Sequence, residues 1–380
     1  MTIVTVEKCQ NYFGDTARKA IERGLAPLGG IKAFVKPGQK VLLKPNLLRK
    51  ARPEEAVTTH PAVVKAVAEL VIAAGGKVII GDSPGAAGPH TRNNLIKLYR
   101  GCGLDRVANE TGAELALDTD QEIVPLPAGK IIKRIELTKY AGEVDVIINL
   151  PKLKTHCFTL LTGAVKNLFG LVPGLIKPAY HAKFPDVDDF STMLVDLMEL
   201  VSPALTIVDA VWAMEGDGPN AGTTRETGLI VTGKNTAAVD AVLSQIMGID
   251  PLIISTTLRC VERGLLPEDL SAIEVRGVEL SEVIQSDFKI PPGRTHAFPR
   301  WAVPFMPIAK LLLSTRPRIN KRNCVGCGDC ERVCPVNTIS MNNGKAHIHL
   351  SNCIRCYCCH ETCTHHAIDL IRPLFQRLFV

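Results

Sequence analysis

The sequence contains no apolar run of the roughly 18–20 residues that a membrane-spanning helix requires. Its first residues, MTIVTVEKCQ, lack the basic segment and apolar core of a secretory signal peptide. Aromatic residues make up only 5% of the chain, and neither an aromatic platform nor a basic helix accompanies the net charge of +6. These absences predict a cytoplasmic protein without a nucleic-acid partner.

Common catalytic and nucleotide-binding motifs are also missing. No G-x-S-x-G sequence is present, so serine hydrolase chemistry has no support. The sequence of residues 228–235 is close to the P-loop motif that binds phosphate. However, a strand is predicted at the loop positions, and Asn235 replaces the magnesium-binding Ser or Thr. Gly216, Gly218 and Gly222 precede a strand instead of the helix that would receive a pyrophosphate. We therefore expect no flavin or nicotinamide site.

The overall composition is that of a globular protein. Apolar residues account for 46% and charged residues for 22% of the chain. A length of 380 residues predicts two or three domains. The thirteen cysteines stand out, because in a reducing compartment they are more often metal ligands than disulfide partners.

Eight of these cysteines form two runs with the spacing C-x2-C-x2-C-x3-C, and proline follows the first run. Three sulfurs on a tight loop reach one [4Fe–4S] cluster, and the fourth of each run reaches the other cluster. The first predicted ligand set is Cys324, Cys327, Cys330 and Cys363. The second is Cys353, Cys356, Cys359 and Cys334. Residues 318–371 thus resemble the bacterial two-cluster ferredoxin domain, a small α+β fold.

Zinc is the alternative metal for paired C-x2-C units, but two complete four-cysteine runs favour iron–sulfur clusters. Cys358 breaks the spacing, so we expect it to pack near a cluster without binding it. We assign no ligand role to three nearby histidines and no nucleophilic role to Cys157. The histidines are His360, His365 and His366.

Residues 1–290 alternate short apolar runs with helical patterns. The runs are 2–6, 40–43, 77–80, 144–150, 205–208 and 228–231, and helical patterns include 61–74, 191–201 and 236–246. Such alternation predicts βαβ units, and hence an α/β fold with a mostly parallel sheet and flanking helices. A linker at 291–317 and a tail at 372–380 complete the expected domain organisation. Both contain apolar stretches, for which we expect packing on the protein instead of contact with a membrane surface.

Polar residues gather where the predicted strands end, and the carboxyl ends of parallel strands form one edge of a sheet. Alternate residues of an extended segment share a face, so Lys152, Lys154 and His156 are expected to point together. The remaining strand-end residues are Lys44, Asn46, Asp82, Ser83, Asp209, Glu215 and Asp217. Lys166 and Asn167 follow in a segment flanked by glycines.

Five stretches carry a family resemblance. They are KPNLL (44–48), GDSPG (81–85), NLPKLKTH (149–156), TGAVKNLFG (162–170) and DAVWAMEGDGP (209–219). Over nearly all of residues 1–290 the sequence resembles the domain of unknown function 362 family. A ferredoxin domain after this region is a common arrangement in that family. The resemblance implies an iron–sulfur partner and supplies no substrate and no catalytic residue.

The favoured hypothesis is a reductase that receives single electrons from an external low-potential donor, such as a ferredoxin or flavodoxin, and passes them through two [4Fe–4S] clusters. Its small anionic substrate, a carboxylate or phosphate, would bind Lys44, Lys152, Lys154 and Lys166, oriented by Asn46, Ser83 and Asn167. His156 or His181 is the candidate proton donor. Asp82, Asp209, Glu215 and Asp217 would set charge states or bind a cation.

Two alternatives remain. One is a non-enzymatic electron carrier or adapter that docks a partner enzyme, and the other is a metal- or phosphate-dependent transferase with a sensory or structural cluster. A concave pocket near a cluster favours the reductase, and a divalent ion at Asp209 and Asp217 favours the transferase. The sequence gives no signal for an oligomeric state.

Overall fold

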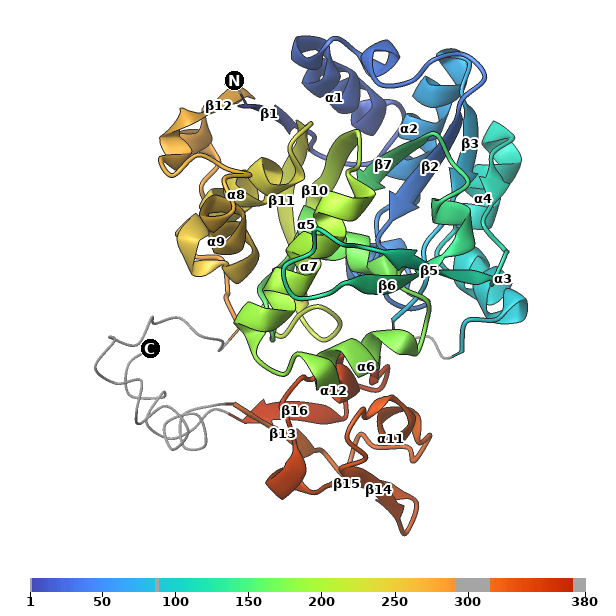
Figure 1. Cartoon of the computed structure of the whole chain (residues 1–380), viewed down its shortest axis with the longest axis vertical. Helices are drawn as coiled ribbons and strands as arrows, with labels where there is room; N and C mark the ends of the chain where they lie inside the picture. Colours follow the sequence, from blue (N-terminus) through green and yellow to red (C-terminus); the bar gives the residue numbers. More distant parts are fainter. Residues whose placement is uncertain (1, 86–88, 292–314, 372–380) are drawn as a thin grey trace.

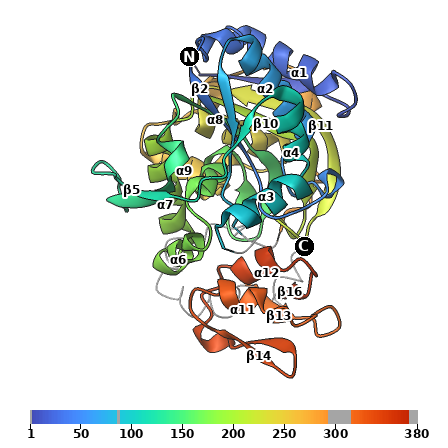
Figure 2. The same cartoon turned by 90° about the vertical axis from the view of Figure 1, so that its right-hand side faces the viewer.

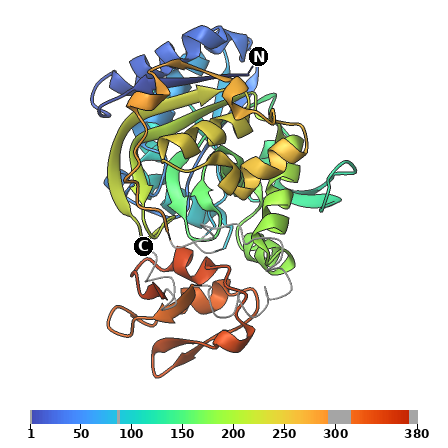
Figure 3. The ribbon, with the colours of Figure 1, turned by 90° about the vertical axis from the view of Figure 1, so that its left-hand side faces the viewer.

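The computed structural model describes residues 2–85, 89–291 and 315–371. Most of the predicted linker and the whole predicted tail lie outside the described residues. The described chain forms a large α/β region and a smaller cysteine-rich region, which lies below it in Figures 1, 2 and 3.

A ten-stranded sheet is the centre of the large region, and its main path runs β12–β1–β11–β10–β7–β2–β3–β4. In this order the strands are Ile273–Gly277, Thr2–Lys8, Thr223–Gly233, Leu205–Glu215, Val146–Leu150, Lys40–Pro45, Lys77–Ile80 and Glu114–Leu115. Strands β10, β7, β2, β3 and β4 pair in parallel, and β11 is antiparallel to both of its neighbours. The prediction of an α/β fold with a mostly parallel sheet is confirmed.

Two further strands extend the sheet past the carboxyl end of β7. Strand β8 (Lys152–His156) pairs with the far part of β10, and β9 (Leu160–Thr162) pairs with β8. A separate hairpin consists of β5 (Gln121–Pro125) and β6 (Arg134–Thr138). Strands β8 and β9 belong to the stretch in which the sequence concentrates its cationic residues, so these residues enter the folded core.

Helices cover both faces of the sheet because its strands are apolar on both sides. Side chains of successive residues point to opposite faces, and accordingly Ile207 and Val208 belong to different apolar cores. One core includes α1 (Thr16–Leu25), α2 (Pro61–Ala73), α3 (Arg92–Gly101) and α4 (Leu104–Thr111). The other includes α5 (Ala164–Asn167), α7 (Val187–Val201), α8 (Thr236–Ile246) and α9 (Ser255–Glu262).

Asn235, which interrupts the apparent P-loop, has a structural role. Its side-chain oxygen accepts hydrogen bonds from the backbone N–H groups of Ala237 and Ala238, both at 3.0 Å, and so caps helix α8. The preceding residues belong to β11, as the sequence predicted.

The described part of the cysteine-rich region contains two short antiparallel strand pairs and two short α-helices. Strand β13 (Arg316–Ile319) pairs antiparallel with β16 (Ile368–Ile371), and β14 (Ile339–Asn342) pairs antiparallel with β15 (Lys345–Ile348). Helices α11 (Asp329–Val333) and α12 (Cys358–Thr362) each carry part of one cysteine run. Helix α12 lies on the side facing the α/β region, close to α6 (Ile176–Lys183) in Figures 1 and 2.

Among the helices that the structure describes, none has both the length and the apolar character needed to cross a bilayer.

Candidate functional site

One cavity lies where the strand ends of the α/β region meet the cysteine-rich region. It holds about 670 Å³ of empty space, part of which is open to solvent. Its lining includes these predicted site residues: Asn46, Asp82, Ser83, Lys154, His156, Lys166, Asn167 and His181. The cysteine-rich region contributes Val333, Cys358, Glu361 and Thr362. Segments that are far apart in the sequence, from both regions, therefore build one concave site.

Other predicted residues lie outside the lining. Lys44, Lys152, Asp209, Glu215 and Asp217 are not among the residues that line the cavity. The structure thus divides the predicted site into a set that faces the cavity and a set that does not.

Lys44 and Lys152 each form a buried ion pair. Lys44 Nζ lies 2.7 Å from Asp82 Oδ1, and Lys152 Nζ lies 2.9 Å from Asp209 Oδ2. The Tyr12 hydroxyl also donates to Asp209, at 2.6 Å. Burial lowers the pKa of both lysines, and the paired carboxylates oppose that shift. Their charges are neutralised inside the sheet, so these two lysines hold strands together.

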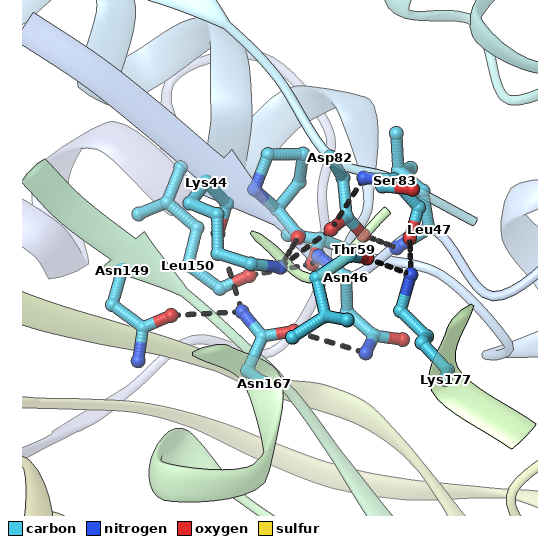
Figure 4. A network of polar contacts seen from close by, with 12 residues as sticks. Lys44, Asn46, Leu47, Thr59, Asp82, Ser83, Asn149, Leu150, Asn167 and Lys177 are labelled. Carbon is cyan, nitrogen blue, oxygen red and sulfur yellow. Dashed lines mark hydrogen bonds and ion pairs between the residues drawn. The ribbon is translucent and has the colours of Figure 1, made fainter. Parts of the chain in front are cut away.

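Asparagine side chains connect the cavity lysine Lys154 to the sheet, and Figure 4 shows these asparagines, Asn46, Asn167 and Asn149. Lys154 Nζ donates to Asn46 Oδ1 at 2.8 Å and to the Val57 carbonyl at 2.7 Å. The Asn46 amide donates to Asn167 Oδ1 at 3.0 Å, and Asn167 donates to Asn149 Oδ1 at 2.8 Å. This chain of amides fixes the orientation of the cavity floor before a ligand binds.

The glycines around Lys166 make room for buried carboxylates. A Cβ atom at Gly163 would overlap the Asp240 carboxylate, and one at Gly170 would overlap Asp82 and Lys44. Asp240 accepts the backbone N–H groups of Ala164 at 2.5 Å and Val165 at 3.0 Å, which begin α5. Close approach of backbone and carboxylate therefore places Lys166 at the cavity wall.

Lys166 is the least constrained lysine of the cavity. Its Nζ lies 5.7 Å from the centre of the Phe169 ring and 5.8 Å from that of Phe190. It is half-buried, and no described residue forms a hydrogen bond with it. Burial lowers its pKa, and the nearby charge of Glu361 opposes the shift. A cation so placed lacks a close counter-ion.

Lys177 lines the same cavity, although the sequence analysis did not select it. Its Nζ donates to the carbonyls of Ser83 at 2.7 Å and Val172 at 2.6 Å. Burial lowers the pKa of Lys177 to about 7. Lys177 lies four residues before His181 on one helix, and this spacing was the available sequence signal.

His156 is held in one tautomer. Its Nδ1 accepts hydrogen bonds from the backbone N–H groups of Phe158 at 3.0 Å and Thr159 at 3.4 Å, so in the neutral ring Nε2 carries the proton. Nε2 lies 3.2 Å from Glu361 Oε1. Burial lowers the pKa of His156 to about 4 and that of His181 to about 3. Both rings are neutral at pH 7, which weakens their predicted role as proton donors.

Glu361 reaches the cavity from α12 and was also missed by the sequence analysis. Burial raises its pKa, but the close contact with His156 and the charge of Lys166 outweigh that effect and lower the pKa to about 2. No sequence pattern marks this residue, because it stands between two cysteines of a run and the cavity lies in another region of the chain.

The two predicted cysteine sets line two further cavities, of about 350 and 320 Å³. The first is lined by Cys324, Cys327, Cys330 and Cys363. The second is lined by Cys334, Cys353, Cys356 and Cys359, together with Cys358. Four sulfurs around one space are the donor set that a [4Fe–4S] cluster requires. Cys358 also lines the cavity that contains the lysines. It therefore forms part of the wall between that cavity and the second cysteine set.

The acidic residues outside the cavity are arranged differently from a cation site. Glu215 pairs with Arg225 at 2.9 Å and with Lys289 at 3.1 Å, and Asp217 is exposed. Within the described ranges, no group of three or more His, Cys, Asp or Glu side chains surrounds a position for a single metal ion. This arrangement gives the transferase hypothesis no support.

These features define an α/β protein joined to an iron–sulfur domain, with a cationic cavity between them. Residues 41–245 match the family described as Domain of unknown function (DUF362), and residues 316–364 match a 4Fe-4S dicluster domain. The chain belongs to the DUF362 family.

Two similar proteins extend the comparison. The Thylakoid-associated protein sll1697 of Synechocystis sp. (strain ATCC 27184 / PCC 6803 / Kazusa) is 38% identical over 268 residues, which cover 70% of this chain and 80% of that protein. The lactate racemase apoprotein from Thermoanaerobacterium thermosaccharolyticum superimposes with a TM-score of 0.40 at 14% identity. That match covers 65% of this chain and spans 57% of the racemase chain.

Proposed function

We propose that this protein is an iron–sulfur reductase that reduces a small anionic substrate, a carboxylate or phosphate, in the cavity between its two regions. The observation that carries the proposal is the position of Cys358. This residue lines both the proposed substrate cavity and the cavity surrounded by the second cysteine set. The proposed cluster site that supplies electrons therefore lies next to the cavity that contains the lysines.

The lysines of the cavity support an anionic substrate. Lys154, Lys166 and Lys177 all line the cavity, and burial lowers the pKa of each. Asp82, the nearest carboxylate of the α/β region in the lining, is already paired with Lys44. An anion that enters the cavity favours the charged form of these amines, so its binding is coupled to proton uptake.

The proposal includes two [4Fe–4S] clusters, which supply electrons one at a time when bound. Cys327 of the first set is exposed, whereas Cys356 and Cys359 of the second set are buried, and Cys358 between them lines the cavity. This asymmetry supports entry of electrons from an external ferredoxin or flavodoxin at the first set and delivery at the second. A cytoplasmic location is part of the proposal, because none of the thirteen cysteines forms a disulfide and a reducing compartment keeps thiols available to bind iron.

Reduction of a carbonyl or an activated double bond consumes two electrons and two protons. Lys177 is the residue we assign to one of these protons, since a proton donor works best when its pKa is near the working pH, and that of Lys177 is about 7. Neutral His156 instead offers its Nε2–H as a hydrogen-bond donor that orients the substrate.

A carrier or adapter protein is the second candidate. It accounts for the cysteine sets but gives no reason for a cavity lined by lysines that lack close counter-ions. The two candidates differ in what a small anion does to the reduced protein.

The test begins with anaerobic purification and mass-spectrometric identification of small anions released by denaturation. The identified anion is then added to the holoprotein reduced by dithionite, from which excess reductant has been removed. A reductase is reoxidised and converts the anion to a product with two more electrons and two more protons. A protein that releases no anion, or stays reduced when the anion is added, contradicts the proposal.

A further inference from the structure

Within the part of the chain that the structure describes, three buried polar atoms of titratable cavity residues have no well-formed hydrogen bond. They are His156 Nε2, His181 Nδ1 and Glu361 Oε1, each with less than 1 Å² exposed. They come from β8, α6 and α12, and all three residues line the same cavity. An unsatisfied buried polar atom destabilises the folded chain, so three around one space indicate a ligand that supplies the missing bonds.

The donor or acceptor character of these atoms indicates which groups the ligand must carry. His156 Nε2 carries a proton, because Nδ1 accepts two backbone N–H groups, so it requires an acceptor. A Glu361 carboxylate oxygen accepts and requires a donor. The two atoms lie 3.2 Å apart and attract each other, but their alignment is not that of a well-formed hydrogen bond. A ligand that satisfies both has a donor and an acceptor on neighbouring atoms.

We propose that Glu361 is a specificity-determining residue that accepts a hydrogen bond from a hydroxyl or amino group of the substrate, while Lys154 and Lys166 bind the substrate's anionic group. The substrate class is then an anion with an O–H or N–H group beside the charge, such as a hydroxy acid or an amino acid. This inference rests on the proposed anion site of the preceding section.

The cysteine-rich region brings Glu361 to the site. Asn220 of the α/β region donates to the Cys363 carbonyl at 3.0 Å, two residues beyond Glu361, and Asn220 in turn accepts from Arg49. This contact holds the end of α12 against the cavity. The α/β region alone supplies the cations, and the docked cysteine-rich region adds the acceptor that distinguishes among anions.

The test uses two probes of nearly equal shape, 2-hydroxyisobutyrate and pivalate, which differ by a hydroxyl in place of a methyl group. Each is titrated calorimetrically into the anaerobic holoprotein. A hydrogen bond to a charged acceptor contributes about 1.5–3 kcal/mol, so the wild type should bind the hydroxy acid at least about tenfold more tightly. Glu361→Leu should remove this preference and leave pivalate affinity within about threefold.

Glu331→Gln is the matched control, because Glu331 is an exposed carboxylate on the corresponding helix α11. It should keep the full preference, and the cluster absorbance of every variant reports an intact iron–sulfur domain. Equal binding of both probes by the wild type, or a preference that survives Glu361→Leu, overturns the inference and leaves the anion site standing. Failure of both probes to bind overturns the anion site, and with it the proposed function.

Discussion

Two kinds of lysine lie near the strand ends of the large sheet. Lys44 and Lys152 are fully buried and each contacts a carboxylate within 3 Å. Lys166 and Lys177 line the cavity, and neither forms an ion pair with a described residue. The difference shows that burial alone does not identify a binding lysine. The decisive feature is whether the folded chain already provides the counter-ion.

The largest expected effect is a loss of stability when a lysine of the first, ion-paired kind is removed. Removal of one partner from a buried ion pair leaves an uncompensated charge and costs about 3–5 kcal/mol. Lys152→Ala should therefore lower the free energy of unfolding by about that amount, measured by denaturant titration of the holoprotein. Lys65→Ala is the control, since Lys65 forms its ion pair with Glu110, at 2.6 Å, on the surface. A Lys152→Ala protein as stable as this control would place Lys152 among the binding lysines.

The second prediction concerns binding. Lys166→Ala removes a cation that forms no hydrogen bond within the described fold and that we propose as a ligand of the anion, so affinity for the co-purified anion should fall roughly 10- to 100-fold. The denaturation midpoint and the cluster absorbance should not change. Loss of cluster content in this variant would contradict the separation between anion site and cluster site.

The third and smallest effect is a change in pH dependence. The pKa of Lys177 is about 7, so above pH 7 its amine must gain a proton before it can pair with an anion. Anion affinity should fall as pH rises above 7, by at most about tenfold per unit for this proton. Lys177→Met should flatten this fall, and Lys177→Arg should flatten it while keeping affinity high. An unchanged slope in both variants would assign the proton to Lys154 or Lys166.

The fold was largely predictable because its signals are local. Continuous apolar runs marked six strands of the sheet, and the helical patterns correspond to α2, α7 and α8. The antiparallel direction of β11 was not predicted, because the apolar runs 205–208 and 228–231 are far enough apart for a crossover, whereas the full strands β10 and β11 leave only residues 216–222 between them. The cysteine spacing predicted the iron–sulfur domain, whose chemistry requires ligands at fixed separations.

The site was predictable only in part, because charge pairing is a property of the folded chain. Alternation along β8 placed Lys152 and Lys154 on one face, but Lys152 contacts Asp209 whereas Lys154 contacts Asn46. Neither partner is adjacent in sequence. Glu361 was missed for the same reason, since the wall it completes belongs to a distant part of the chain.

Because α12 forms one wall of the cavity, the parts of the cavity are made in a fixed order during synthesis of the chain. The ribosome completes the α/β region, with every lysine of the cavity, before it makes residues 358–362. The cavity stays open on one side until the second cysteine run has folded, and folding of metal-ligating regions is coupled to binding of their metal. The last step in building this site is therefore tied to the cell's supply of iron and sulfide, so that a chain without its clusters presents an unfinished pocket.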